Sequence, residues 1–200
     1  DRAEALRARR RAAIALLDSL PQSLFASEIS GEALVDTKPL EELVDPNRPI
    51  SYGILMPGPP QDSGVGYVRV ADMRDGGIDL ATVRYTTPEI SAAYRRSLLK
   101  ANDVLLSIRG HVGRLALVPQ ELDGANITQD TARLAVAGAE PIFVLEYLRS
   151  TAAQDWMRKH TKGVAVQGIN LGDVKKIPIP LPSREVQRRF ARKAQAVEKL

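Results

Sequence analysis

The residues best suited to chemistry in this 200-residue sequence gather in one short polar segment between two apolar runs. The segment is Arg109-Gly110-His111-Val112-Gly113-Arg114, inside "DVLLSIRGHVGRLALVP". The two glycines let the backbone approach another surface closely. The two arginines can bind phosphates or the edge of a guanine, and the histidine can act as an acid or a base. The alternative is a hairpin turn whose charged side chains are solvated or paired with acids.

The rest of the sequence gives little support for catalysis. His111 has no carboxylate or nucleophile at a recognisable spacing, and "GPPQDSGVG" lacks the strand and helix start of a cofactor-binding glycine motif. The motifs of an amino-methyltransferase are missing. Asp72, Asp75 and Asp79 suggest a metal-dependent nuclease, but the turn at Asp75-Gly76-Gly77 explains them better. We predict no catalytic residues and no cofactor, and keep an enzyme fragment that uses His111 or these acids as an alternative.

The composition excludes several further classes of protein. The absence of Cys removes disulfides, thiolate metal sites and a catalytic thiol. His111 and His160 leave little for a zinc site, so no metal is predicted. No apolar run approaches the roughly 20 residues of a membrane span, and no signal peptide is visible, so we expect a cytoplasmic protein. Because the sequence lacks an initiator Met and ends in a charged helical pattern, we expect an excerpt of a longer protein.

Charge is distributed unevenly along the chain. The net charge is +4, with +3 in residues 1–11, +4 in residues 184–200 and −3 between them. Within this middle part, basic side chains concentrate in residues 84–114 and 149–176, while 28–45 is acidic. A nucleic-acid-binding protein needs such a local basic face rather than a high overall charge.

Apolar spacing predicts a helix at each end of the chain. Leu6, Ala13, Leu17, Leu20 and Leu24 recur at three- and four-residue steps within 2–27, apart from a gap at Arg10, a seam typical of coiled coils. A second seam follows in residues 184–200, where Ser183 can cap the first turn. Each apolar stripe requires another helix as a partner.

Between these helices, short apolar runs alternate with Gly, Pro, Asn and Asp. The runs predict strands at 66–70, 82–85, 103–108, 113–118 and 131–136. A helix is predicted at 141–159, then an exposed loop at 161–172 and an extended piece at 174–181. The predicted fold class is α+β, one mixed α/β domain flanked by N- and C-terminal coiled-coil-like helices. The predicted boundaries are 1–27, 28–182 and 183–200.

Three residues outside the polar segment are also candidates for binding. Lys162 can neutralise a phosphate and Gln167 can read adenine; the alternative for both is a mobile surface loop. Tyr52 can stack on a nucleotide or donate to one, or can be a partly buried tyrosine. Arg69 and Asp72 share a polar strand face and are expected to pair with each other.

The order of several segments resembles one known family, the specificity subunits of type I restriction–modification enzymes. The segments cover nearly the whole chain. They read "RRRAAIALLDSLPQSLFASEI", "ISYGILMPGP", "GVGYVRVADM", "NDVLLSIRGHVGRLALVP", "NITQDTARLAV" and "FVLEYLRSTAAQDWMRKHTKGVAVQGINLGDVKKIPIPLPSREVQRRF". The first is similar to the family's conserved helix between two recognition domains, and the last ends like its proline-rich entry into a spacer helix. The usual Glu-Gln pair is here Glu185-Val186-Gln187.

The resemblance implies a subunit without catalytic activity that carries two target recognition domains, each reading one half of a bipartite DNA sequence. Two antiparallel helices separate the domains and dock methyltransferase (modification) subunits, which use S-adenosylmethionine; a restriction/translocase subunit can then join. This chain contains one recognition domain. It therefore matches either half of a full subunit or a half-subunit that forms a homodimer.

We therefore predict that the chain binds double-stranded DNA, with phosphate contacts positioning it and a few side chains reading base edges. The predicted DNA-binding residues are Tyr52, Arg109, His111, Arg114, Lys162 and Gln167. Besides the enzyme fragment, two alternatives stay open. The chain can be the recognition domain of a fused type II restriction–methyltransferase, or a protein-binding coiled-coil scaffold.

Overall fold

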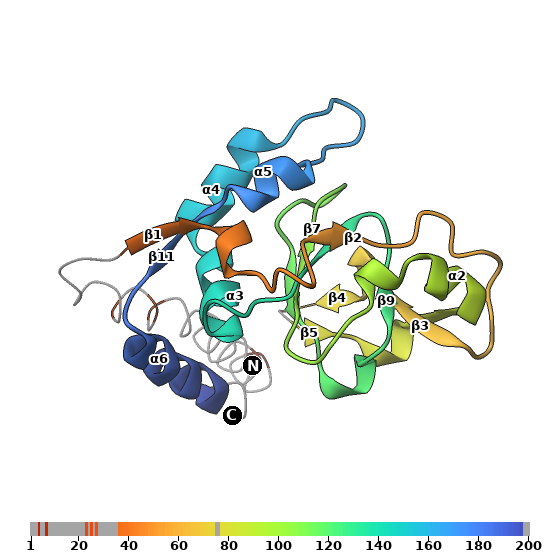
Figure 1. Cartoon of the computed structure of the whole chain (residues 1–200), viewed down its shortest axis with the longest axis horizontal. Helices are drawn as coiled ribbons and strands as arrows, with labels where there is room; N and C mark the ends of the chain where they lie inside the picture. The colour runs from red at the N-terminus through yellow and green to blue at the C-terminus, as the bar shows by residue number, and fades with distance from the viewer. Residues whose placement is uncertain are drawn as a thin grey trace.

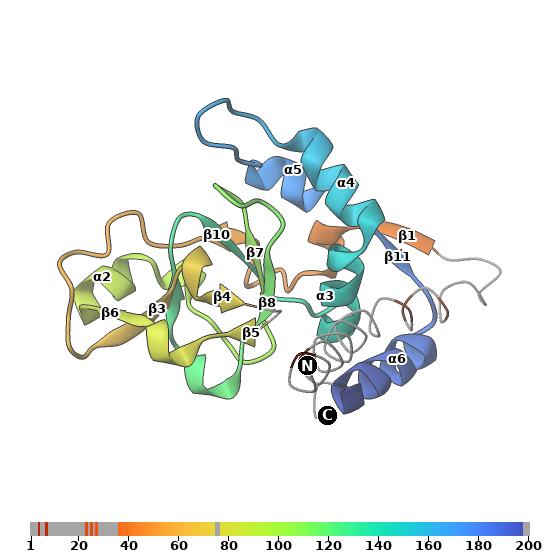
Figure 2. The same cartoon turned by 180° about the vertical axis from the view of Figure 1, so that it is seen from behind.

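A computed structural model describes residues 36–74 and 77–197, together with Glu4, Arg7, Ser23, Phe25 and Ser27. The α-helices are α2 (Pro88–Ala93), α3 (Pro141–Arg149), α4 (Thr151–His160), α5 (Leu171–Lys175) and α6 (Arg184–Val197). Helices α3, α4, α5 and α6 gather at one end of the molecule, and most strands lie at the other together with α2 (Figures 1 and 2). Short 3-10 helices are η1 (Leu40–Leu43), η2 (Val70–Asp72), η3 (Leu80–Thr82), η4 (Arg95–Ser97) and η5 (Gln120–Leu122). The predicted mixed α/β fold is confirmed.

The strands form two larger sheets and two pairs. An antiparallel sheet has the order β2-β10-β7-β8, and a second has the order β6-β3-β9 with β3 parallel to β9. Their strands are β2 (Ser51–Tyr52), β10 (Thr131–Leu134), β7 (Val104–Ser107), β8 (Leu115–Leu117), β6 (Arg84–Thr86), β3 (Val65–Val68) and β9 (Asn126–Ile127). The antiparallel pairs are β1 (Asp36–Pro39) with β11 (Pro178–Leu181) and β4 (Met73–Arg74) with β5 (Gly77–Ile78).

Strand β7 is buried on both faces, which explains why its sequence is continuously apolar rather than alternating. Successive side chains of a strand point to opposite faces. Val104 and Leu106 accordingly join the hydrophobic cluster that includes α3 and α6, while Leu105 joins a second cluster with Val68 and Ile127 of β3 and β9. The main sheet therefore separates two cores.

The predicted strands are confirmed, with bounds that differ by at most two residues. The predicted helix at 141–159 is wrong in one respect, because it is divided into α3 and α4. Ser150 adopts extended backbone angles between them, and its side chain accepts a hydrogen bond from the backbone N–H of Ala153. A serine in this conformation ends one helix and caps the next.

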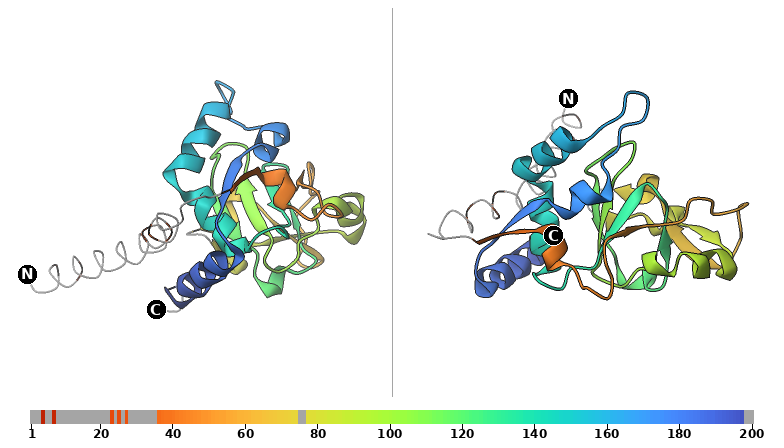
Figure 3. Two further views of the ribbon diagram at one scale, coloured as in Figure 1. Left: turned by 60° about the vertical axis from the view of Figure 1, so that its left-hand side comes forward. Right: turned by 45° about the horizontal axis from the view of Figure 1, so that its top comes forward.

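The loop predicted at 161–172 is shorter than expected, since α5 begins at Leu171. Asn170 caps this helix by accepting a hydrogen bond of 2.8 Å from the N–H of Asp173. The following extended piece is confined to β11, and it pairs with β1, a strand the sequence analysis missed. The segment that follows α4 projects from the molecule in the two views of Figure 3.

The predicted N-terminal helix at 2–27 lies mostly outside the described residues, and Phe25 marks where its described part meets the core. The Phe25 ring is 5.1 Å from that of Phe143 on α3 and 5.5 Å from that of Phe190 on α6. Helix α6 thus buries one face against α3, as its apolar spacing predicts. In the part of the chain that is described, no helix is long and apolar enough to cross a membrane.

Candidate nucleic-acid interface

Two adjoining hollows lie between the strands and the segment that follows α4. The first has a volume of about 500 Å³ and is lined by Tyr52, Leu55, Ile108, Arg109, Gln129, Lys162, Val166, Gly168, Ile169, Asn170 and Leu171. The second has a volume of about 540 Å³ and is lined by Ile50, Ser51, Tyr52, Leu55, Ala93, Tyr94, Arg95, Arg96, Ser97 and Leu171. Because Tyr52, Leu55 and Leu171 line both, the hollows are continuous, and we call them together the basic cleft.

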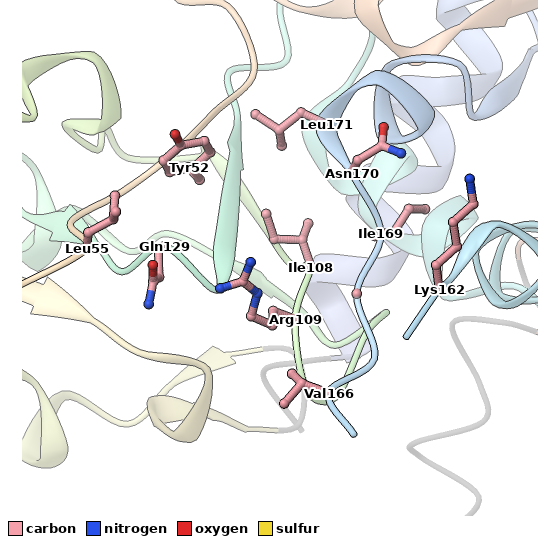
Figure 4. A pocket seen from close by; sticks show the side chains of 11 residues that line it. Tyr52, Leu55, Ile108, Arg109, Gln129, Lys162, Val166, Ile169, Asn170 and Leu171 are labelled. Atoms are coloured by element: carbon pink, nitrogen blue, oxygen red, sulfur yellow. The ribbon is translucent and has the colours of Figure 1, made fainter. Parts of the chain in front are cut away.

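The charge of the basic cleft is entirely positive among its described lining residues. Arg95, Arg96, Arg109 and Lys162 line it, and no Asp or Glu does. Tyr52 and Leu55 lie on one side of the first hollow and Lys162 and Asn170 on the other, with Arg109 between them (Figure 4). Such a surface suits a polyanion that also presents flat, apolar bases.

Arg133, which the sequence analysis did not single out, holds one wall of the cleft. It is 1% exposed, and its guanidinium donates to the carbonyl oxygens of Arg96 at 2.8 Å and Pro49 at 3.0 Å. It also lies 3.4 Å from the hydroxyl of Ser51, next to Tyr52. Burial, and then the nearby charge of Arg48, lowers the pKa of Arg133. This buried arginine thus fixes the backbones that present Tyr52 and Arg96.

Arg95 and Arg96 are functional candidates that sequence reasoning missed. They form η4 directly after α2, and both are exposed. Thr87 caps α2 by accepting from the N–H of Ile90, and Pro88 begins the helix. The Thr-Pro-Glu start of a helix followed by two arginines was the available signal.

Arg109 sits at the centre of the cleft on a fixed backbone. The N–H of Ile108 donates to the backbone carbonyl oxygen of Asp130 at 2.8 Å, and the N–H of Gly110 donates to that of Gln167 at 2.8 Å. The Arg109 guanidinium lies 3.9 Å from the carboxylate of Asp130. The loop after α4 and the polar segment are therefore joined directly, which brings Arg109 and Lys162 together.

Lys162 and Gln167 belong to a closed hairpin rather than a free loop. The backbones of Lys162 and Gly168 exchange two hydrogen bonds of 2.8 Å. Gly163 has φ +108°, and a Cβ there would lie 2.2 Å from the carbonyl oxygen of Val166. The hairpin exposes Val164 completely and Val166 by 60%, so its tip is apolar.

His111 and Gln167 lie just beyond the first hollow. Both line a neighbouring hollow of about 400 Å³ that faces α4. The His111 carbonyl accepts from the Ser107 hydroxyl, which shapes the turn. These two predicted residues are thus adjacent to the basic cleft but do not line it.

Arg114 is directed elsewhere. Its guanidinium donates to the carbonyl oxygens of Val70 at 3.1 Å and Met73 at 3.4 Å. Its backbone N–H donates to the hydroxyl of Ser107 at 2.8 Å. The side chain therefore links the turn to η2 and β4, away from Arg109.

The acids considered for catalysis have structural partners. Asp72 is buried, and its carboxylate accepts two hydrogen bonds from the Arg69 side chain at 2.5 and 3.0 Å, which confirms the expected pair. The hydrogen bond that the Arg69 side chain donates to the Asp72 carboxylate raises the pKa of Arg69. Asp79 caps η3 through the N–H of Ala81, and Asp75 lies outside the described residues. Across residues 36–74 and 77–197, no three His, Asp or Glu side chains cluster to hold a metal.

The chain is similar to known proteins of one kind. The sequence pattern of the type I restriction modification DNA specificity domain matches residues 61–199. The specificity subunit of the type I restriction enzyme EcoBI from Escherichia coli is 34% identical over 158 residues, which cover 78% of this chain and 33% of that protein.

Solved structures share the fold. A chain from a type I restriction–modification system, solved to explain complex assembly and conformational transition, has a TM-score of 0.69 at 21% identity. The alignment covers 99% of our chain and 48% of that one. The HsdS subunit from Thermoanaerobacter tengcongensis has a TM-score of 0.65 at 22% identity. Its alignment covers 99% of this chain and 47% of that subunit. The chain thus spans about half the length of these subunits and a third of the EcoBI subunit.

The pattern match covers more than half of the chain and the EcoBI relative covers most of it, so the predicted family and the predicted non-catalytic role are both confirmed. The chain belongs to the family of type I restriction–modification DNA specificity domains, which recognise DNA and carry out no catalysis themselves.

Proposed function

We propose that this chain reads one half of a bipartite double-stranded DNA sequence, as part of a specificity subunit or as a half-subunit that dimerises. The observation that carries the proposal is the basic cleft. Its four cationic side chains, with no acid among the described lining residues, suit a phosphate backbone, and Tyr52 offers an aromatic face. Phosphate contacts position such a domain, while base contacts specify the sequence.

In this proposal, the six predicted DNA-binding residues differ in how directly they contact the DNA. Tyr52, Arg109 and Lys162 line the cleft, so they contact the DNA most directly. His111 and Gln167 reach it from the adjoining hollow. Arg114 supports the turn through Val70 and Met73 and contributes to binding indirectly.

The terminal helices dock methyltransferase subunits in our proposal, and a restriction/translocase subunit joins through them in the cytoplasm. Helix α6 buries Val186, Phe190 and Ala194 against the domain and exposes Arg188 and Arg192 on its other side. A helix with one face buried and the other basic and exposed leaves a surface for a partner. The second recognition domain comes either from the remainder of the polypeptide or from a second copy.

Salt dependence of DNA binding tests the proposal. With the complete natural protein assembled with its modification subunits, the logarithm of affinity for a specific duplex should fall linearly with the logarithm of salt concentration. The double substitution R95A/R96A should weaken binding and reduce the magnitude of that slope by about two, since it removes two cations that each neutralise one phosphate.

Fluorescence anisotropy over a series of salt concentrations measures both quantities. The matched control is R74A, since Arg74 is an exposed arginine that lines neither hollow of the cleft. An unchanged slope in R95A/R96A would exclude Arg95 and Arg96, and with them the second hollow, as phosphate contacts. A wild-type complex that shows no specific binding would exclude the function.

A further inference from the structure

Among the four cations of the basic cleft, only Arg109 combines a backbone fixed on both sides with a carboxylate beside its guanidinium, within the described part of the chain. We propose that Arg109 reads a guanine in the major groove and that Asp130 orients it for this task. This assignment rests on the proposed function and goes further, because it names the base and the positioning residue.

The backbone of Arg109 is held by two separate segments. On one side, the N–H of Ile108 donates to the backbone carbonyl oxygen of Asp130 at 2.8 Å, and the carbonyl oxygen of Ile108 accepts from the backbone N–H of Ile169 at 2.9 Å. On the other side, the N–H of Gly110 donates to the backbone carbonyl oxygen of Gln167 at 2.8 Å. Ile108 and Ile169 are both buried in the larger core. Reading a base requires such a rigid origin, since small displacements break a bidentate contact.

The side chain of Arg109 extends from this fixed backbone into the basic cleft. It is 57% exposed, and Figure 4 shows it pointing into the first hollow near Gln129. Its Nε lies 3.9 Å from Oδ1 of Asp130. A carboxylate on the Nε edge leaves both Nη groups for the O6 and N7 atoms of guanine.

One carboxylate oxygen of Asp130 lacks a hydrogen-bond donor, and Arg109 can supply one. Its Oδ1 atom is buried and has no hydrogen-bond partner among the described residues. Leaving a buried carboxylate oxygen without a donor is costly, and the Nε–H of Arg109 is the donor within reach. Closing the gap of 3.9 Å to hydrogen-bond length satisfies Asp130 and fixes the plane of the guanidinium in the same movement.

The other cations of the cleft lack this pairing. Among the described residues, Arg95, Arg96 and Lys162 have no carboxylate within ion-pair distance. Unoriented side chains suit phosphates, which accept hydrogen bonds from many directions and carry no sequence information. The cleft therefore divides into three phosphate-binding cations and one oriented base reader.

A discrimination profile of the complete natural protein, assembled with its modification subunits, tests the assignment. Competition binding against duplexes that each carry one substituted base pair gives the penalty at every position. One G·C pair in the half-site should carry a penalty of about 5- to 150-fold in the wild type. In R109K, which keeps the charge but lacks the planar guanidinium and the Nε–H that Asp130 can orient, that penalty should fall below about 3-fold while other positions keep theirs.

Three further variants complete the test. D130N should reduce the same penalty at the same position, because the amide no longer draws the guanidinium into place. K162A should weaken all duplexes by a similar factor and leave the profile unchanged. R74A is the matched control: its Nη1 lies 3.8 Å from Asp79, with a similar exposure of 63%, and it lines neither hollow. R74A should change neither the affinity nor the discrimination profile.

Two outcomes would overturn the assignment while the proposed function stands. One is a uniform loss of affinity in R109K with an intact profile, which makes Arg109 a phosphate contact. The other is a wild-type profile in D130N, which removes Asp130 from recognition. Absence of any sequence preference in the wild type would instead overturn the proposed function and this assignment together.

Discussion

At the scale of single residues, arginine takes several different roles in this domain. Arg133 is buried and serves the backbone, Arg114 ties a turn to η2 and β4, and Arg109 points into the basic cleft. The polar segment predicted Arg109 and Arg114 as equals, since the two residues flank the same turn. The difference between them comes from what packs beside the turn, which is the hairpin after α4 on one side and β4 on the other.

We expect Arg133→Met to destabilise the fold. The substitution removes the donor of the hydrogen bonds to the carbonyl oxygens of Arg48, Pro49 and Arg96. Hydrogen bonds that involve a charged group contribute about 1.5–3 kcal/mol each, so the free energy of unfolding should fall by roughly 3 kcal/mol. Urea denaturation followed by circular dichroism measures it.

Arg84→Met provides the control, because Arg84 is also a strand arginine but is exposed. It should change the free energy of unfolding by less than about 0.5 kcal/mol. Equal stability of the two variants would show that the hydrogen bonds of Arg133 do not support the cleft wall.

At the scale of elements, the hairpin between α4 and α5 brings the predicted contacts together. Residues 162 and 168 close it, and Gln167 and Gly168 join it to the polar segment. An exposed loop by composition is thus a defined structure, with Lys162 at its base and two valines at its tip. Its shape depends on Gly163, which alone among the hairpin's residues has a positive φ.

Gly163→Ala should weaken DNA binding without unfolding the domain. A Cβ at this position meets the Val166 carbonyl oxygen at 2.2 Å, so the hairpin must change shape. Strain of about 1–3 kcal/mol confined to the hairpin should lower affinity by roughly 5- to 150-fold. Titration of a target duplex measures the affinity, and thermal denaturation checks the fold.

Gly124→Ala is the matched control. Gly124 also has a positive φ, of +80°, but a Cβ there meets no atom within 4 Å, and the residue lines neither hollow of the cleft. It should cost a little stability and leave DNA affinity intact. A similar loss of affinity in both variants would contradict the role of the hairpin.

At the scale of the whole molecule, a sheet with a core on each face supports both proposed activities. The larger core holds α3, α6 and the ring of Phe25 together with Ile50, Ile108 and Ile169 of the cleft, and the other core holds Val68, Leu105 and Ile127. Strands β1 and β11, which come from the beginning and the end of the domain in sequence, pair beside these helices (Figure 1). In our proposal, the basic cleft binds DNA and the exposed face of α6 binds the partner, so the two surfaces lie on different elements.

Two substitutions on α6 should separate its structural face from its docking face. Phe190→Ala removes a side chain with no exposure from the aromatic cluster and should lower the free energy of unfolding by about 3–5 kcal/mol. Arg192→Glu lies on the exposed face and should leave stability within about 0.5 kcal/mol of wild type. We expect it to weaken association with the methyltransferase.

Size-exclusion chromatography of the assembled complex and urea denaturation of each variant provide the two readouts. Unchanged assembly in Arg192→Glu would place the docking surface elsewhere. A stable Phe190→Ala variant would contradict the packing of α6 against α3.

The sequence by itself determined the types of the main elements and the family. The strands around 104–107 and 131–134 follow from apolar runs between turn residues, and the helices from their spacing and caps. The ordered segments resemble the family, and the match of its sequence pattern to residues 61–199 confirms that resemblance. Arg109 and Lys162 were predictable as candidates, since both stand in polar turns.

Only the tertiary structure decided which of these residues meet. Strand alternation placed Arg133 on the face of β10 opposite Ala132 and Leu134, but no local pattern states that Pro49 and Arg96 cover that face. Likewise, the basic cleft joins segments far apart in sequence through hydrogen bonds between backbones, which every residue except proline can donate. Side-chain spacing encodes which residues share a face; packing against distant segments decides whether that face is buried, tethered or open to DNA.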